Sequence, residues 1–423
     1  MNSPYRQTNA PNSSHHLPCL MGRRSLLKGL GAIALAQLAA GCGGSRTPDI
    51  TIQFLKNSIP TALLREFQKA NPTNVVQFQS VETLSSVYDA LTATDATIDS
   101  SAMATVLGDY WLTPAIRQNL IAPIDPKELD GWSRIPTVWK ELVTRNAKGM
   151  PASNGKVWGA PYRWGSLAII YQIEAFETLG WVPTDWTDLW RPELKQHISL
   201  PDSPRTVIGL ALKQLGESFN ATTLDNQSLS KSSVLNRALQ DLQAQVKLYS
   251  SSAYLQPLTL GDTWLAVGWS TDVLPLLRRD RRFAAVIPAS GTALTADVWV
   301  RPTTPTPTPD DESEEVTSTS SSAPVLDDVT RVQTSIFQNW IKFCWQPNVA
   351  QRISLQGFAA SPVLVDGDRA RLPDSLRTDA LLLPDASILD QSDFILPLPD
   401  DVLAEYKNLW TAMRLGNENE SDP

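Results

Sequence analysis

The sequence predicts an α/β fold, in which short buried strands alternate with amphipathic helices along an open sheet. Residues 167–171 form a brief apolar run rich in β-branched side chains, which is typical of a buried strand and too short to span a membrane. A turn-rich aromatic entry is expected just before it, at 159–165. Apolar residues recur at helical spacing over 186–190, and residues 198–200 supply a further strand. Ligands of such sheets bind beyond the carboxyl ends of the strands.

The first part of the mature chain is expected to fold as β-α-β-α-β. Apolar alternation and apolar runs predict its strands at 50–54, 75–81 and 103–107. Helices are expected between them, over 60–70 and around Val87. The turn Gly108-Asp109-Tyr110-Trp111 directly follows the third strand, so a group that contacts a ligand is expected there.

The rest of the chain continues the alternation and contains one irregular segment. Apolar periodicity predicts helices at 207–215, 239–248, 336–343 and 402–415. Residues 201–204 are expected to form a turn that starts the first of these helices. Residues 303–324 are acidic and rich in Pro, Ser and Thr, so they have little to bury and are expected to be a disordered surface insertion.

The composition fits a globular protein and disfavours nucleic acid as a partner. The chain has 423 residues, of which 42% are hydrophobic, enough for two or three domains with substantial cores. Its formal net charge is −8, and because residues 1–41 hold four basic and no acidic side chains, the chain from Cys42 onward carries −12. Phosphate binding needs basic patches. An acidic surface suits a cationic ligand, although many exported proteins are acidic for solubility alone.

Enzyme chemistry has little support in the sequence. His197 is the only histidine after Cys42, and no G-x-S-x-G motif, P-loop or cluster with zinc-ligand spacing occurs. We therefore expect no catalytic residue, no metal and no cofactor, and a structural role for His197. Cys344 lies between two aromatic residues in a helical pattern and is expected to be a buried thiol without a disulfide partner.

The N-terminal segment is expected to be an export signal. Residues 22–28, Gly-Arg-Arg-Ser-Leu-Leu-Lys, nearly match the twin-arginine pattern, and the apolar segment 29–40 has the length of a signal-peptide core. Residues 38–42, Leu-Ala-Ala-Gly-Cys, look like a bacterial lipobox. They predict that Cys42 is lipidated and that the protein is anchored to a membrane on the periplasmic side.

Three segments resemble the spermidine/putrescine-type solute-binding proteins of ABC importers. They are APYRWGSLAIIYQ at 160–172, WTDLWRPELKQHISLPD at 186–202 and ALKQLG at 211–216. The resemblance implies a two-lobed periplasmic-binding-protein fold of the type II kind, with the ligand cleft between the lobes. It also implies a monomer without enzyme activity, which closes around a small solute by a hinge and delivers it to an ABC permease.

The resemblance further implies a division of the chain into lobes. The expected segments are the extension and signal at 1–41, the first lobe at 48–162, the second lobe at 163–292, a return to the first lobe at 293–361 around the insertion at 303–324, and completion of the second lobe with the tail at 362–423.

Candidate ligand-binding residues follow in two ways. The residues carried over from the family by position are Tyr110 and Trp269 as cleft aromatics, Asp297 as an amine-binding carboxylate, and Phe358 at a position that is usually tyrosine. Their placement alone adds Asp109, after a strand, and Trp164, in the aromatic entry. Aromatic faces and carboxylates are the groups that hold organic cations. For each aromatic residue, ordinary core packing is the alternative.

The ligand class stays open because the chain departs from the family's polyamine site. Two further carboxylates of that site would fall at Ser203 and Thr206, an aromatic residue at Thr295, and a Trp and a Tyr in the loop 55–58. Polyamine is the leading class, beside another amine, a small organic acid and a neutral solute. A different kind of function is also open, namely an exported sensory or interaction module with this fold and no transport role; a hydrolase is a third.

Overall fold

The computed structural model describes residues 47–93, 103–303 and 328–415. The expected export signal, the lipidation site Cys42 and nearly all of the expected insertion at 303–324 lie outside these residues. Within the described ranges, no helix combines the length and the apolar character that crossing a membrane requires.

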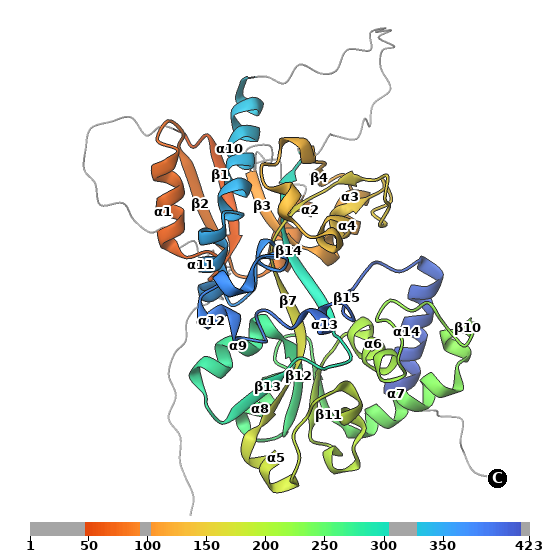
Figure 1. Cartoon of the computed structure of the whole chain (residues 1–423). Coiled ribbons are helices and arrows are strands. Elements are labelled where there is room, and N and C mark those ends of the chain that lie inside the picture. The colour runs from red at the N-terminus through yellow and green to blue at the C-terminus, as the bar shows by residue number, and fades with distance from the viewer. Residues whose placement is uncertain (1–46, 94–102, 304–327, 416–423) are drawn as a thin grey trace, which may run out of the picture. The chain divides into compact units, whose positions relative to one another are not determined.

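Two long antiparallel strands, β7 (Ala160–Gln172) and β14 (Ala293–Pro302), lie at the centre of the large sheet (Figure 1). The strand order is β11-β8-β12-β7-β14-β3-β1-β2. The carboxyl-terminal half of β7 pairs with β12 (Leu265–Trp269) and β13 (Phe283–Val286), whereas β14 pairs with β3 (Met103–Gly108). β7 and β14 therefore connect the strands on one side of the sheet with those on the other, and the region in which these two strands pair is called their crossing.

The strands beyond β14 form the predicted β-α-β-α-β unit. β1 (Ile50–Leu55) pairs in parallel with β2 (Val76–Val81) and with β3, and α1 (Thr61–Ala70) and α2 (Leu84–Thr92) connect them. Alternate side chains of β1 are buried, as the sequence pattern indicates, because successive residues of a strand point to opposite faces.

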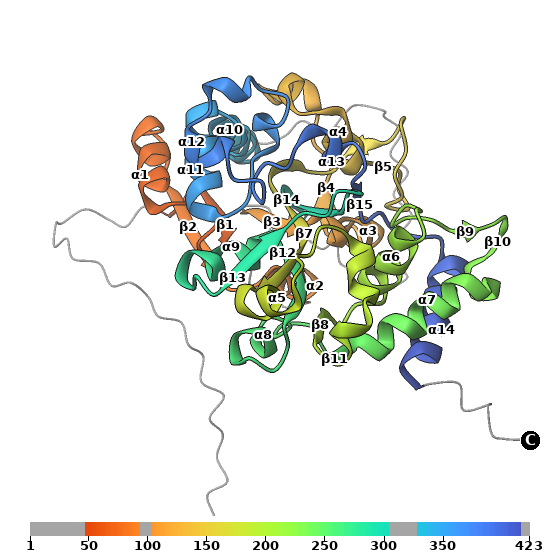
Figure 2. The same cartoon turned by 60° about the horizontal axis from the view of Figure 1, so that its bottom comes forward.

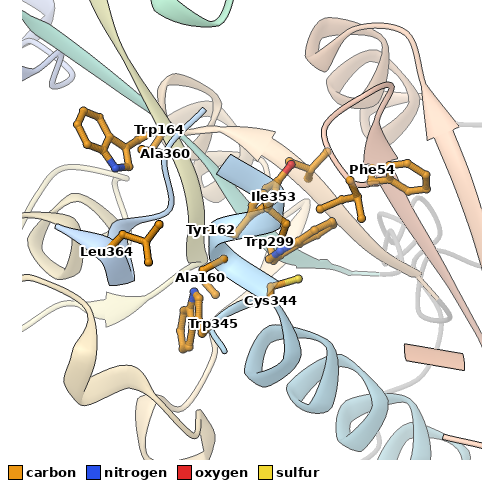
Figure 3. Close-up of a cluster of buried hydrophobic side chains, with 14 of the residues drawn as sticks. Phe54, Ala160, Tyr162, Trp164, Trp299, Cys344, Trp345, Ile353, Ala360 and Leu364 are labelled. Atoms are coloured by element: carbon orange, nitrogen blue, oxygen red, sulfur yellow. The ribbon is translucent and has the colours of Figure 1, made fainter. Parts of the chain in front are cut away.

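The helices α10 (Asp328–Cys344) and α11 (Pro347–Gly357) pack on the crossing of β7 and β14 (Figure 3). Tyr162 of β7 stacks on Trp299 of β14, with 4.5 Å between the ring centroids. The indole N–H of Trp345 donates to the carbonyl oxygen of Pro161 at 2.7 Å. Cys344 is a free thiol in this core, as predicted, and its burial raises the pKa of the thiol.

On the other side of β7, β8 (Ile198–Pro201) and β11 (Val246–Ser250) continue the sheet beyond β12. The helices α6 (Pro204–Gln214), α7 (Ser233–Gln245) and α14 (Asp400–Leu415) pack against one another (Figures 1 and 2). Their apolar faces belong to a second core, which is formed with β8 and β12.

The remaining helices and strands are short, apart from α9 after β12. They are α3 (Leu112–Arg117), β4 (Ile121–Ala122), α4 (Thr137–Val143), β5 (Thr144–Arg145), β6 (Lys156–Val157), α5 (Ile173–Leu179), β9 (Thr223–Leu224), β10 (Gln227–Ser228), α8 (Gln256–Leu260), α9 (Ser270–Arg279), α12 (Asp374–Arg377), α13 (Ala386–Leu389) and β15 (Asp393–Phe394).

Two predicted elements differ from the structure. The turn expected at 159–165 is instead the first part of β7, which pairs with β14 and accommodates Pro161 where the register shifts. The helix expected over 239–248 begins earlier, at Ser233, and ends at Gln245. The residues after it form β11, because Val246 and its neighbours find a strand partner in β8, which helical periodicity cannot show.

The packing around residue 362 does not separate the two predicted lobes. Leu364, Leu376 and Phe394 share one core both with Trp340 of α10 and with Val273 of α9. Residues 362–394 thus contribute to a core that they share with elements assigned to both lobes, whereas α14 packs in the second core. The lobe boundaries therefore stay a prediction.

A test of the tight turn before β14 uses Gly291→Ala. Gly291 has φ +88°, and an added Cβ would lie 2.1 Å from the carbonyl oxygen of Gln391. We expect the free energy of unfolding to fall by about 2 kcal/mol or more, because a strained backbone angle and a clash add up. The control is Gly180→Ala, since Gly180 has φ +77° and open space around it, and about 1 kcal/mol is expected there. Equal losses in denaturant unfolding would contradict the clash.

Candidate ligand-binding site

A cavity of about 1040 Å³ opens where loops that follow β3, β8 and β12 meet the crossing of β7 and β14. Its aromatic lining comprises Tyr110, Trp111, Trp164, Tyr254 and Trp269. Its charged lining comprises Glu82, Asp109, Arg163, Asp202, Arg205, Asp272 and Asp297. These are the residue types that bind a small polar or charged organic molecule.

Five of the six predicted site residues line this one cavity: Asp109, Tyr110, Trp164, Trp269 and Asp297. Phe358 does not. Its backbone has φ +54° after the end of α11, and its side chain packs against the first core, next to cavity-lining Ala359. The proposed role of Phe358 in ligand binding thus has no support from the cavity lining.

Asp109 follows β3 directly and is held by β14. Its Oδ1 accepts the hydroxyl of Thr295 at 2.8 Å and the backbone N–H of Ala296 at 3.0 Å. Burial raises the pKa of Asp109 to about 6, because desolvation of the carboxylate outweighs these hydrogen bonds and the nearby Arg145. Thr295, which replaces an expected aromatic residue, therefore positions a carboxylate.

Asp297 forms a buried ion pair with Arg163 of the facing strand. The two residues are directly opposite in the register of β7 and β14, and Arg163 Nε lies 2.5 Å from Asp297 Oδ2. Arg163 Nη1 also donates to the carbonyl oxygen of Gly357, the last residue of α11, at 3.1 Å. Both side chains reach the cavity wall. Because of the ion pair, Asp297, the predicted amine-binding carboxylate, already has a cationic partner in the protein.

Asp272 lies in the first turn of α9, directly after β12, and is exposed to the cavity. Its carboxylate accepts the hydroxyl of Tyr254. The surrounding protein desolvates the carboxylate and raises its pKa, against the lowering effects of the Tyr254 hydrogen bond and of Arg163. No ion pair to Asp272 occurs among the residues that the structure describes.

Tyr110 lies among these three carboxylates. Its side chain is 53% exposed, and the pKa of its phenol is raised by desolvation and by the negative charges of Asp297, Asp109 and Asp272. The ring of Tyr110 is tilted against that of Trp111, with 5.6 Å between the centroids. An exposed aromatic face beside carboxylates is suited to a cation.

A second arginine lies behind Asp109. Arg145 is 1% exposed, and burial lowers the pKa of its guanidinium to about 10. Its nitrogens donate to Thr113 Oγ1 at 2.8 Å and to the backbone oxygen of Asp109 at 3.3 Å. Arg145 therefore supports the Asp109 turn and adds a positive charge behind it.

The outer charges of the cavity have partners elsewhere. Glu82 pairs with Lys56 at 2.8 Å, and Asp202 lies 3.6 Å from Arg414. Arg205 donates to the carbonyl oxygens of Phe219 and Leu396 at 3.1 Å each.

Ser203 and Thr206, where the family's carboxylates would fall, cap the start of α6. The Ser203 hydroxyl accepts the backbone N–H of Thr206 at 3.3 Å and lies 3.1 Å from its hydroxyl. The predicted turn and helix start are thereby confirmed, and neither side chain supplies a charge to the cavity wall that both help to line.

His197 lies away from the cavity. It stacks on Trp264, with 3.5 Å between the ring centroids, which agrees with a structural role. In the described ranges, no group of three or more His, Cys, Asp or Glu side chains is arranged to hold a metal ion.

The sequence did not single out several cavity residues, among them Arg163, Tyr254 and Asp272. A usable pattern existed for Asp272, which comes three residues after Trp269, the last residue of β12, and lies in the first turn of a helix. Arg163 lies inside one of the segments that resemble the binding-protein family, but its facing carboxylate is distant in sequence. Tyr254 carries no local pattern.

Comparison with known proteins agrees with this geometry. The family model for bacterial extracellular solute-binding proteins matches residues 97–315, just over half of the chain. The spermidine/putrescine-binding periplasmic protein of Salmonella typhimurium is 24% identical over 61% of this chain and 70% of its own length. The putrescine/cadaverine-binding protein of Pseudomonas aeruginosa is 30% identical over 34% of this chain and 42% of its own length.

Solved structures show the same fold. The spermidine/putrescine ABC transporter substrate-binding protein of Streptococcus pneumoniae aligns with a TM-score of 0.68 at 19% identity, covering 86% of this chain and 98% of that one. The Tp0655 lipoprotein of Treponema pallidum aligns with a TM-score of 0.57 at 14% identity, covering 87% and 99%. The predicted α/β periplasmic solute-binding fold is confirmed, and so is the resemblance to the spermidine/putrescine-binding proteins. Because the family model matches more than half of its residues, this chain belongs to the bacterial extracellular solute-binding proteins, a family that binds solutes and is not enzymatic.

Proposed function

We propose that this protein is the solute-binding lipoprotein of an ABC importer and that its ligand is a small organic cation. The relatives named above are described as binding spermidine, putrescine or cadaverine, all of which are cationic amines. The cavity carries the appropriate chemistry, and the anchor rests on Cys42 in its lipobox-like sequence.

One observation carries the choice of a cation: Asp109, Asp272 and Asp297 line the same cavity as the exposed ring of Tyr110, and, besides desolvation, their negative charges raise the pKa of its phenol. Carboxylates hold amines through charge-assisted hydrogen bonds, which are stronger than neutral ones. The faces of Tyr110 and Trp269 add a cation–π attraction of about 0.5–2 kcal/mol each. An organic anion would meet repulsion from Asp272, which is exposed to the cavity and has no ion pair among the described residues.

Transport would follow from closure of the cavity around the ligand. Its walls come from both sides of the crossing strands, with Tyr110 following β3 and Trp269 ending β12. A hinge motion along β7 and β14 would bring these two walls together over a bound solute. The closed form is then the one that a permease would bind.

The proposal is tested by a thermal-shift panel on the exported protein. We expect stabilisation by amines such as putrescine, spermidine and butylamine, because a ligand that binds only the folded state raises its melting temperature. Sugars and dicarboxylic acids should leave it unchanged. Absence of a shift with every amine would contradict cation binding and favour the sensory or interaction module.

Asp272→Asn should weaken amine binding. Loss of a charge-assisted hydrogen bond predicts a fall in affinity of about tenfold to a hundredfold in isothermal titration calorimetry. Asp262→Asn is the matched control, because Asp262 is an exposed carboxylate near Lys247, outside the cavity, and should bind as the wild type does. Equal affinities of the two variants would remove Asp272 from the site.

Amine affinity should depend on pH through Asp109. Because its pKa is raised to about 6, the carboxylate is ionised at pH 7.5 and mostly protonated at pH 5, so cation affinity should fall as the pH falls through 6. We expect a decrease of about threefold to tenfold, the effect of one titrating group over this range. Asp109→Asn keeps the Oδ1 acceptor and should flatten this part of the profile. An unchanged profile in the variant would assign the titration to another group.

Cys42→Ser should release the protein from the membrane. The variant lacks the thiol that would carry the diacylglyceryl group, so it is expected in the soluble periplasmic fraction and without label after growth with radioactive palmitate. Cys344→Ser is the control, because that thiol is buried in the core and should have no influence on labelling. Palmitate label that persists in Cys42→Ser would contradict the anchor.

A further inference from the structure

Arg163 is a fixed cation in the cavity wall. It is 6% exposed, and its guanidinium is held from two sides, by Asp297 at 2.5 Å and by the carbonyl oxygen of Gly357 at 3.1 Å. That carbonyl belongs to the last residue of α11, where the helix dipole is negative. Separating a buried ion pair leaves an uncompensated charge, so Arg163 does not move aside for a ligand.

The five charged groups at the centre of the cavity add up to a single net negative charge. Asp109, Asp272 and Asp297 are three carboxylates, and two guanidiniums act on them: Arg145 on Asp109, and Arg163 on Asp297 and Asp272. The outer carboxylates have their own cations, as described above. Arg205 also lines the cavity, and its guanidinium donates to the carbonyl oxygens of Phe219 and Leu396, which leave its positive charge in place. The cavity as a whole is therefore no more negative than its five central groups.

We propose that the ligand carries one positive charge, because Arg163 occupies the position beside Asp297 that a second ammonium group would take. This proposal rests on the proposed function. The ligand is then a monoamine or a quaternary ammonium compound, and a diamine is disfavoured. A second ammonium group would approach Arg163 and would leave the cavity with a net positive charge.

The single cation is placed against Asp272. This carboxylate is exposed to the cavity and is oriented by the hydroxyl of Tyr254. Tyr110 and Trp269 supply aromatic faces in the same cavity. The ion pair of Arg163 and Asp297 then forms another part of the cavity wall, which carries no net charge.

The test compares butylamine with putrescine, which share one carbon chain and differ by one ammonium group, with choline as a quaternary probe. Titration calorimetry on the exported protein at pH 7.5 should give butylamine or choline at least about tenfold tighter binding than putrescine, the factor of one charge-assisted contact.

Two variants test the effect of the charge of Arg163 on the preference between the amines, and a third variant is the control. Arg163→Met frees Asp297 and makes the net charge of the cavity more negative by one unit, so the preference should shift toward putrescine by about tenfold or more. Arg163→Met combined with Asp297→Asn removes both charges of the pair and should keep the preference for a monocation. Arg352→Met makes the same substitution on the exposed face of α11, where Arg352 pairs with Glu66, and should leave the ratio unchanged.

The outcomes separate the two proposals. Putrescine binding as tight as butylamine in the wild type, or a double variant that prefers putrescine, would overturn the single-charge inference and leave cation binding intact. Absence of binding by all amines would overturn the proposed function itself. A poorly folded Arg163→Met protein leaves the wild-type comparison and the double variant to decide.

Discussion

The ion pair of Arg163 and Asp297 is the constraint around which the centre of the molecule is arranged. Both groups lie on long strands at the crossing of the sheet, and neither could be buried there without the other. The pair lies at the residue where the register of β7 and β14 shifts, next to the carboxyl end of α11. One group, the guanidinium of Arg163, thus links the two central strands, the end of α11 and the charge of the cavity wall.

The remaining charges of the cavity are placed by the ends of strands. Asp109 follows β3 and opens a short helical turn before α3, whereas Asp272 lies in the first turn of α9, directly after β12. The two residues thus lie on the two sides of the crossing. In α/β sheets such positions collect side chains from distant segments at one edge. The scaffold thus concentrates carboxylates without any local sequence cluster, and the cavity they share is wide enough for a small organic ligand.

The sequence predicted the parts of this arrangement that depend on local pattern. An apolar run predicted the strand before Asp109, and the position after that strand predicted Asp109 itself. The partnership of Arg163 with Asp297 could not be predicted, because 134 residues separate them and only strand pairing brings them together. Phe358 was placed in the cleft by similarity, yet the left-handed turn after α11 directs its side chain to the core and leaves Ala359 at the cavity.

The departures from the polyamine site fit together once the contacts are known. Ser203 and Thr206 complete the start of α6, and Thr295 donates to Asp109, so these positions are used for structure and orientation. A site that had merely lost its carboxylates would be left with unpartnered cations or an apolar wall. Here a buried arginine neutralises the carboxylate of Asp297, and a different carboxylate, Asp272, opens on the cavity. Because the charges are redistributed in a consistent way, the cavity is better explained as a binding site with altered selectivity than as a degenerate one.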